Sequence, residues 1–132
     1  MHRSRLTTIF IDCDDRDFDR AVSFWSEALG REAMLKEDDT RYVSLKGRLG
    51  GEGAPIVGLQ RVAAENRAIH LDIETDDLEA EVARLENLGA RVKARIRRHV
   101  VMLAPSGHPF CVVPVYRRDF PEKTACWESP EV

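Results

Sequence analysis

Three residues that can bind a metal ion or move a proton occupy alternate positions of one short segment: His70, Asp72 and Glu74. Alternate side chains of a β-strand point to the same face, so all three are expected to share a face. Residues two apart are separated by about 7 Å, so only one of the two acids can join His70 at a single ion. His70 can act as a general base or a hydrogen-bond donor, or it can simply pair with Asp72 or the backbone.

Other catalytic patterns are missing from the sequence. No Ser-His-Asp arrangement is visible, and the glycine-rich segment Gly50–Gly53 precedes a strand-like run rather than the helix that phosphate binding requires. The cysteines Cys13, Cys111 and Cys126 are odd in number and lack metal-ligand spacing. A disulfide scaffold or a zinc knuckle is therefore not expected, and a reducing cytoplasm fits the chain best.

Two strands are expected to carry the candidate residues. Leu6–Asp12 and Ala68–Glu74 both alternate between a more apolar and a more polar face, which is typical of a sheet covered by helices on one side only. The residues predicted to face helices are Ile9, Ile11, Leu71 and Ile73. Those predicted to face the opposite, concave side are Thr8, Phe10, His70 and Asp72.

An amphipathic helix is expected after each strand, at about residues 17–29 and 77–88. The apolar stripes are Phe18, Val22, Trp25 and Leu29 in the first helix and Leu78, Val82, Leu85 and Leu88 in the second. Three strand-like runs then follow each helix, at about residues 33–37, 41–45 and 56–62 and at about residues 91–95, 100–104 and 109–115. The order βαβββ therefore occurs twice.

This repeat predicts an α+β fold with a single domain over residues 1–132. Two tandem βαβββ units, at about residues 5–62 and 66–116, are expected to form curved mixed β-sheets with the helices on the outer face. The polar tail, residues 117–132, shows no period and is expected to lie over the body or a partner. Any small-molecule site is expected in the cleft between the two units.

Bulk composition excludes several classes of partner. The chain has 132 residues, 43% of them hydrophobic, and a formal net charge of −3, so no strong field of either sign is expected. We therefore expect no nucleic-acid partner. The apolar run Leu6–Ile11 is far shorter than the roughly 20 residues that span a bilayer, so no membrane partner is expected either.

Four segments together resemble a known family. They are RAIHLDI at Arg67–Ile73, the helix end Leu88–Ala90, the turn and strand start at Leu103–Phe110, and the helix segment Phe24–Gly30. Over about residues 5–116 the chain resembles the glyoxalase-like members of the vicinal oxygen chelate superfamily. That superfamily includes glyoxalase I, extradiol dioxygenases, and fosfomycin- and bleomycin-resistance proteins. The resemblance implies the same paired-unit fold.

The resemblance also implies where a metal ion would bind. In metal-using members, the first strand of each unit supplies a His or Gln, and the last strand supplies a Glu. His70 lies at one such position, but Thr8 lies at its counterpart in the first unit. The glutamate positions fall on Cys111, or Val113 after a slip of one pleat, and on Val57 or Leu59 in the first unit. Because a lone His–Cys pair is a weak ligand set, no metal site and no cofactor are expected.

Three functions remain open at this stage. The favoured one is a protein that binds a small organic molecule in an apolar cleft without the family's divalent metal. The second is a divergent metal-dependent lyase, isomerase or dioxygenase that uses His70 with Asp72 or with a non-protein ligand. The third is a structural or regulatory dimer module with a filled cleft.

The candidate site residues are the same for the first two functions. The best catalytic candidate is His70. The predicted ligand contacts are Thr8, Phe10, Val57, His70, Asp72, Met102, Cys111 and Val113. Members of the family commonly pair, so the resemblance implies a homodimer, to which tail residues Phe120 and Trp127 can contribute.

Overall fold

The computed structural model describes residues 1–36, 38–46 and 53–128. The expected strand end at residue 37, most of the glycine-rich loop at 47–52 and the tail residues 129–132 lie outside the described residues. No helix in the described ranges is long and apolar enough to cross a membrane.

The described chain follows the order βαβββ twice, as the repeat predicts. The first unit contains β1 (His2–Asp14), α1 (Phe18–Leu29), β2 (Glu32–Lys36), β3 (Asp39–Lys46) and β4 (Ile56–Val62). The second contains β5 (Ala68–Thr75), α2 (Leu78–Asn87), β6 (Arg91–Ile96), β7 (His99–Leu103) and β8 (Pro109–Pro114). Short 3₁₀ turns cover Asp15–Asp17 and Ala64–Asn66, and a further strand, β9 (Ala125–Trp127), follows in the tail.

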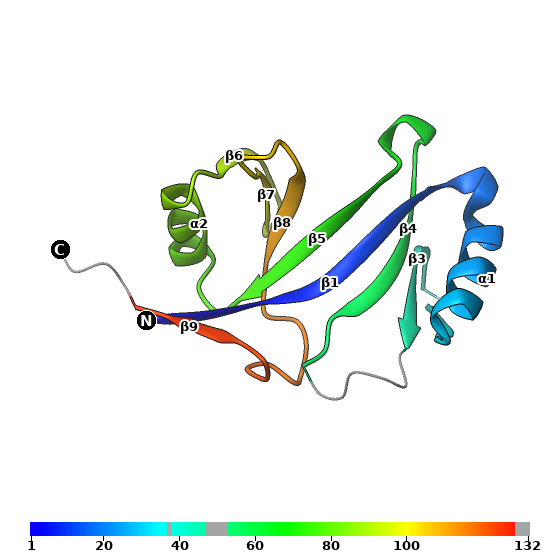
Figure 1. The fold of residues 1–132 in the computed structure, drawn as a ribbon, viewed down its shortest axis with the longest axis horizontal. Helices are drawn as coiled ribbons and strands as arrows, with labels where there is room; N and C mark the ends of the chain where they lie inside the picture. The colour runs from blue at the N-terminus through cyan, green and yellow to red at the C-terminus, as the bar shows by residue number, and fades with distance from the viewer. Residues whose placement is uncertain (37, 47–52, 129–132) are drawn as a thin grey trace.

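One mixed sheet joins the two units. Its strand order is β2-β3-β4-β1-β5-β8-β7-β6, with β9 paired to β1. Within each unit the first and last strands are parallel, β1 with β4 and β5 with β8, and the units meet where β1 and β5 pair antiparallel. The two helices lie at opposite outer ends of the curved sheet (Figure 1). The predicted α+β fold of two units with outer helices is confirmed.

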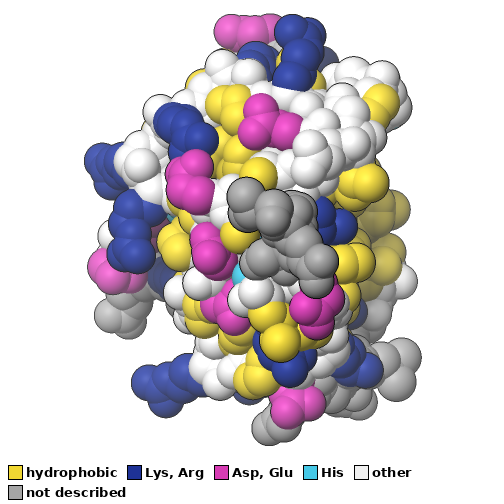
Figure 2. Space-filling view, turned by 90° about the vertical axis from the view of Figure 1, so that its left-hand side faces the viewer, with side chains coloured by type: hydrophobic (Ala, Val, Ile, Leu, Met, Phe, Trp, Pro, Cys, Tyr) yellow, Lys and Arg dark blue, Asp and Glu magenta, His cyan; other side chains and the backbone are white. Residues whose placement is uncertain are grey.

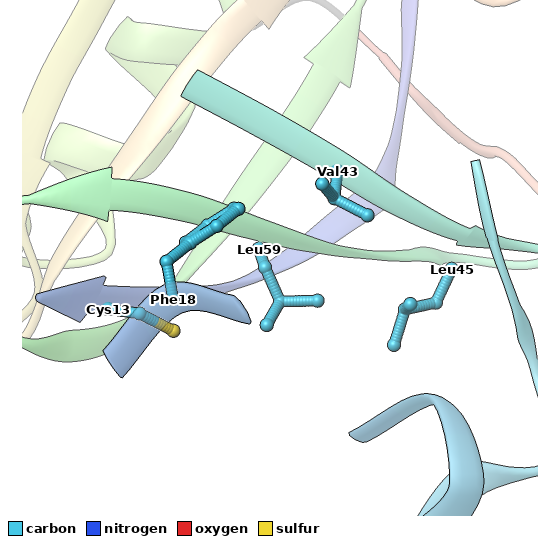
Figure 3. Close-up of a cluster of buried hydrophobic side chains, with 5 residues drawn as sticks. All are labelled: Cys13, Phe18, Val43, Leu45 and Leu59. Atoms are coloured by element: carbon cyan, nitrogen blue, oxygen red, sulfur yellow. The ribbon is translucent and has the colours of Figure 1, made fainter. Parts of the chain in front are cut away.

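Each helix covers its own hydrophobic cluster. Under α1, the buried residues Cys13, Phe18, Val43, Leu45 and Leu59 come from β1, β3, β4 and the helix itself (Figure 3). Under α2, the buried residues are Val82, Leu85, Val100, Met102 and Val112. Ile11 packs against the first cluster and Ile73 against the second, so both face helices as predicted.

The outer face of the two central strands is only partly covered. Ile9 and Leu71 pair across β1 and β5 on the side that carries the helices, but Leu71 is 43% exposed. The helices sit at opposite ends of the sheet and leave this middle part open (Figure 1). Leu71 therefore lies on the predicted side of the sheet, but no helix covers it.

The tail folds back over the body of the same chain. β9 pairs antiparallel with the start of β1, and the Trp127 indole N–H donates to Ser4 Oγ at 2.9 Å. Arg5 donates to Glu74 Oε1 at 2.8 Å and pairs with Asp119 of the tail at 2.7 Å. These contacts explain why β1 begins at His2, four residues before the predicted start.

Charges of both signs cover the end of the molecule that carries α2 and the N-terminus. Figure 2 views this end and shows Lys and Arg beside Asp and Glu, with hydrophobic side chains between them. The described residues of that end therefore form no broad patch of one sign.

Candidate functional site

The candidate residues on β1 and β5 meet on the face that points away from both helices. Thr8 pairs with Asp72, and Phe10 pairs with His70, in the antiparallel register. Because Ile11 and Ile73 pack in the helix-covered clusters, the alternate positions point to the concave side. Asp12, two residues beyond Phe10, shares this face.

Three rings form a cluster at the centre of the concave face, and we call Phe10, Tyr42 and His70 the ring cluster. The Phe10 and His70 rings are stacked, with centroids 5.0 Å apart and planes at 25°. Tyr42 of β3 lies on the other side of Phe10, with centroids 6.0 Å apart. A Cβ at Gly58 would lie 2.9 Å from Phe10 Cε1, so this glycine leaves room for the ring to lie across β4.

Two carboxylates flank the His70 imidazole. His70 Nδ1 lies 2.8 Å from Asp12 Oδ2, and Nε2 lies 3.6 Å from Asp72 Oδ1, which is too long for a hydrogen bond. Burial lowers the pKa of His70, but the Asp12 hydrogen bond and the charges of Asp12 and Asp72 outweigh it, so the pKa is raised. For Asp72 burial acts in the opposite direction and is the main cause that raises its pKa to about 6.

Cys111 lies beside these acids on β8. It is the register partner of Asp72 in the parallel β5–β8 pair. Burial, followed by the charges of Asp72 and Asp12, raises the pKa of the Cys111 thiol to about 12. In the absence of a cation the thiol therefore stays protonated at neutral pH and is a poor nucleophile.

The metal ion implied by the resemblance can be tested against these residues. His70, Asp72 and Cys111 each offer a donor atom, and the three atoms lie within 4.8 Å of one another. All three belong to the second unit. On the first-unit side, Thr8 Oγ1 is already hydrogen-bonded to the Tyr116 hydroxyl at 2.5 Å, and Gly58 has no side chain. The residues therefore do not fit a four-ligand set shared by both units.

Two predicted ligand contacts lie on the wrong face. Val57 packs against the cluster under α1, and Met102, which is 0% exposed, belongs to the cluster under α2. The concave positions of β4 are instead Gly58 and Gln60, because they pair with Phe10 and Asp12. Val57 and Met102 are thus core residues. The first-unit ligand position predicted at Val57 or Leu59 instead falls on the residue between them, Gly58.

The remaining predicted contacts lie on the concave side. Thr8 is buried beneath Tyr116, and Val113 is buried beside its register partner Glu74. Phe10, His70, Asp72 and Cys111 form the centre described above. Their contact with a ligand stays a prediction.

The predicted ligand contacts omit four residues of this face: Asp12, Tyr42, Gln60 and Tyr116. Asp12 continues the Thr8–Phe10 alternation, so the sequence did carry a signal for it. Tyr42 and Gln60 pair across β3 and β4, and the Gln60 amide donates to the Tyr42 hydroxyl at 3.3 Å. Tyr116 follows β8 and reaches Thr8 only because the chain folds back, which no local pattern indicates.

Comparison with known proteins gives one family and several similar structures. Residues 8–113 match the family model described as "Glyoxalase-like domain". None of the curated protein sequences matches the chain.

Three solved structures share the fold at low identity. A methylmalonyl-CoA epimerase in complex with methylmalonyl-CoA and NH₄⁺ is 22% identical and has a TM-score of 0.55. The alignment covers 84% of this chain and 94% of the epimerase chain. A hypothetical protein from Bacillus halodurans C-125 is 14% identical, with coverages of 87% and 96% and a TM-score of 0.61. A glyoxalase/bleomycin resistance/dioxygenase superfamily member from Vibrio splendidus is 18% identical, with coverages of 85% and 99% and a TM-score of 0.54.

Proposed function

This chain belongs to the glyoxalase-like domain family, and on that premise we propose that its concave face binds a small organic molecule. The observation that carries the proposal is the ring cluster. Phe10, Tyr42 and His70 come from three different strands, and each remains partly accessible. Ligand sites are mostly apolar and aromatic, with a few polar groups that fix orientation. The similarity to the methylmalonyl-CoA epimerase supports a shared fold, and we do not infer a shared substrate from it.

The polar groups around the rings favour particular ligands. Asp12 and Asp72 place two carboxylates on either side of His70, so an anionic ligand is disfavoured. Arg41 contacts the Tyr42 ring, but it is paired with Asp39. We therefore propose a flat, apolar ligand that is neutral or cationic and has a hydrogen-bonding group directed at His70. Binding of this kind requires no divalent ion shared by the two units.

Three indole compounds test this proposal by calorimetry of the untagged protein in a chelator. Tryptamine is cationic, tryptophol is its neutral counterpart, and indole-3-acetate is anionic, so we expect tryptamine to bind most tightly and indole-3-acetate least. Phe10→Ala should weaken tryptamine binding by about 10- to 150-fold, because about 1.5–3 kcal/mol of apolar burial is lost. Phe24→Ala is the matched control, since Phe24 lies on α1 and is 60% exposed. It should change the affinity by less than about twofold.

The outcome at His70 separates a binding protein from an enzyme. In a binding protein, His70→Gln should weaken tryptamine by only about 2- to 12-fold, the value of one hydrogen bond. The Asp12–His70 contact at 2.8 Å favours proton transfer as a second candidate function. In that case His70→Gln would lower the turnover of a substrate by about 10²-fold or more while its affinity stays nearly intact. Equal tryptamine affinity in Phe10→Ala and Phe24→Ala would overturn the binding proposal and favour a dimer module with a filled cleft.

We also propose that the protein is a cytoplasmic homodimer. Cys13, Cys111 and Cys126 are free thiols, which fits a reducing compartment. On the uncovered outer face of the central strands, Ile69 is 62% exposed and Leu71 is 43% exposed, and such apolar surface favours a partner. The tail is less available than expected, because Trp127 is held within its own chain.

Light scattering at high micromolar concentration should give twice the chain mass of 15.0 kDa. Ile69→Lys should shift the protein towards the monomer, because a charge would then be buried in the contact. A wild-type mass of 15.0 kDa at that concentration would contradict the dimer.

A further inference from the structure

Tyr116, which follows β8, crosses the concave face beside the ring cluster. Its hydroxyl lies 2.5 Å from Thr8 Oγ1, and Thr7 Oγ1 donates a hydrogen bond to it at 3.3 Å. Thr7 is 0% exposed and Thr8 is 2% exposed, whereas Tyr116 itself is 55% exposed. The accessible surface at this point of the concave face therefore belongs to Tyr116 and not to the two threonines.

The backbone of this segment is held independently of the Tyr116 side chain. The amide N–H groups of Tyr116 and Arg117 donate to Glu74 Oε2 at 2.8 and 2.9 Å. The Glu74 side chain is buried and paired with Arg5. The Arg117 guanidinium also donates to the Thr7 carbonyl at 3.2 Å. A substitution of the Tyr116 side chain should therefore change the concave face without releasing the tail from the body.

The Tyr116 hydroxyl lies one step along the strands from the ring cluster. Thr8, which it contacts, precedes Phe10 by two residues on the same face. The register partner of Thr8 is Asp72, which follows His70 by two residues. Two residues of a strand span about 7 Å, so there is room for a short side chain of a ligand between the rings and Tyr116.

Of the two carboxylates that flank His70, Asp72 is the more available to a ligand cation. Asp12 Oδ2 is hydrogen-bonded to His70 Nδ1 at 2.8 Å, whereas Asp72 Oδ1 lies 3.6 Å from His70 Nε2. A cationic group can therefore approach Asp72 without breaking a hydrogen bond to the imidazole. A ligand that stacks on the ring cluster and places its cation near Asp72 directs that cation towards Tyr116.

We propose that Tyr116 is a specificity-determining residue that limits the size of the cationic end of the ligand. This inference rests on the proposed function and narrows the ligand to flat aromatic compounds with a short chain that ends in a primary amine. A bulky substituent on the nitrogen would meet the Tyr116 ring, which is tied to Thr8 by its hydroxyl. Selectivity of this kind comes from a clash with the wrong ligand as well as from contacts with the right one.

Tryptamine and N-benzyltryptamine test the size limit by calorimetry of the untagged protein in a chelator. Both are cations with the same indole ring, and the benzyl compound has a ring on each side of its nitrogen, so neither orientation avoids Tyr116. We expect wild-type protein to bind tryptamine at least about tenfold more tightly than N-benzyltryptamine. Tyr116→Ala should bring the two affinities to within about threefold or reverse their order. Phe24→Ala, the same kind of truncation at an exposed aromatic residue on α1, should keep the wild-type preference.

The ratio of the two affinities separates this inference from the proposed function. An equal ratio in wild-type protein and Tyr116→Ala, or a ratio lost in Phe24→Ala, would overturn the role of Tyr116 while tryptamine binding stands. If neither amine binds wild-type protein, the proposed function fails, and iodoacetamide labelling of Thr8→Cys decides whether Tyr116 closes the face. Adding Tyr116→Ala should then raise the labelling rate of the introduced thiol by at least about tenfold, as tandem mass spectrometry would measure. An unchanged rate would show that Tyr116 does not close the face at Thr8.

Discussion

Replacing Arg5 by methionine should lower the free energy of unfolding by about 3–5 kcal/mol, as urea denaturation would measure. The Arg5 side chain is 1% exposed and that of Glu74 is 0% exposed, so the variant leaves a buried carboxylate without its cation. The variant also loses the Arg5–Asp119 pair at 2.7 Å and the hydrogen bond to the Glu122 carbonyl at 2.8 Å. Both contacts hold the tail against β1.

Arg41→Met provides the matched control. Arg41 pairs with Asp39, but its side chain is 69% exposed, so solvent already screens the pair. We expect this variant to change the unfolding free energy by less than about 1 kcal/mol. Equal losses of unfolding free energy in Arg5→Met and Arg41→Met would show that the contacts of Arg5 with Glu74 and Asp119 do not hold the tail.

Met102→Ala is the second substitution with a large expected effect, at about 2–5 kcal/mol of unfolding free energy. Met102 is 0% exposed in the cluster under α2, so the truncation leaves a cavity between β7 and the helix. The tryptamine affinity of the folded variant should stay within about twofold of wild type, because the side chain faces away from the ring cluster. A tenfold loss of tryptamine affinity without a loss of stability would instead place Met102 on the ligand face.

The fold was predictable because several independent signals agree. Alternation in Leu6–Asp12 and Ala68–Glu74 gave the two central strands, and the stripes containing Val22 and Val82 gave the two helices. The same alternation placed Phe10 and His70 on one face. These are regular elements in which one side is apolar and the other polar, so the period is readable from local sequence.

The misplaced contacts come from strands without such a period. Ile56–Val62 has apolar residues at both odd and even positions, and so does the run Val100–Leu103. A register shift of one residue moves all the side chains of a strand to the other face of the sheet. In such strands only the pairing with neighbouring strands determines the register. The observed pairing of Ile11 with Leu59 puts Val57 under α1.

The pairing of the tail with the start of β1 was not predictable for a different reason. Arg3, Ser4 and Arg5 are polar and give no strand signal, yet Ser4 and Arg5 are buried. Their burial depends on partners far away in the sequence: Ser4 accepts a hydrogen bond from Trp127, and Arg5 pairs with Glu74 and Asp119. Local periodicity carries no information on contacts of this range.

The location of binding is the central claim, and backbone amide shift mapping by NMR tests it most directly. Labelled protein in a chelator is titrated with tryptamine, and the amide shifts of the concave strands are compared with those of the outer helices. Binding at the ring cluster predicts saturable shifts centred on Phe10, Tyr42 and His70, with α1 and α2 largely unchanged. Shifts centred on the uncovered outer face around Ile69 and Leu71, or none at any concave residue, would contradict it.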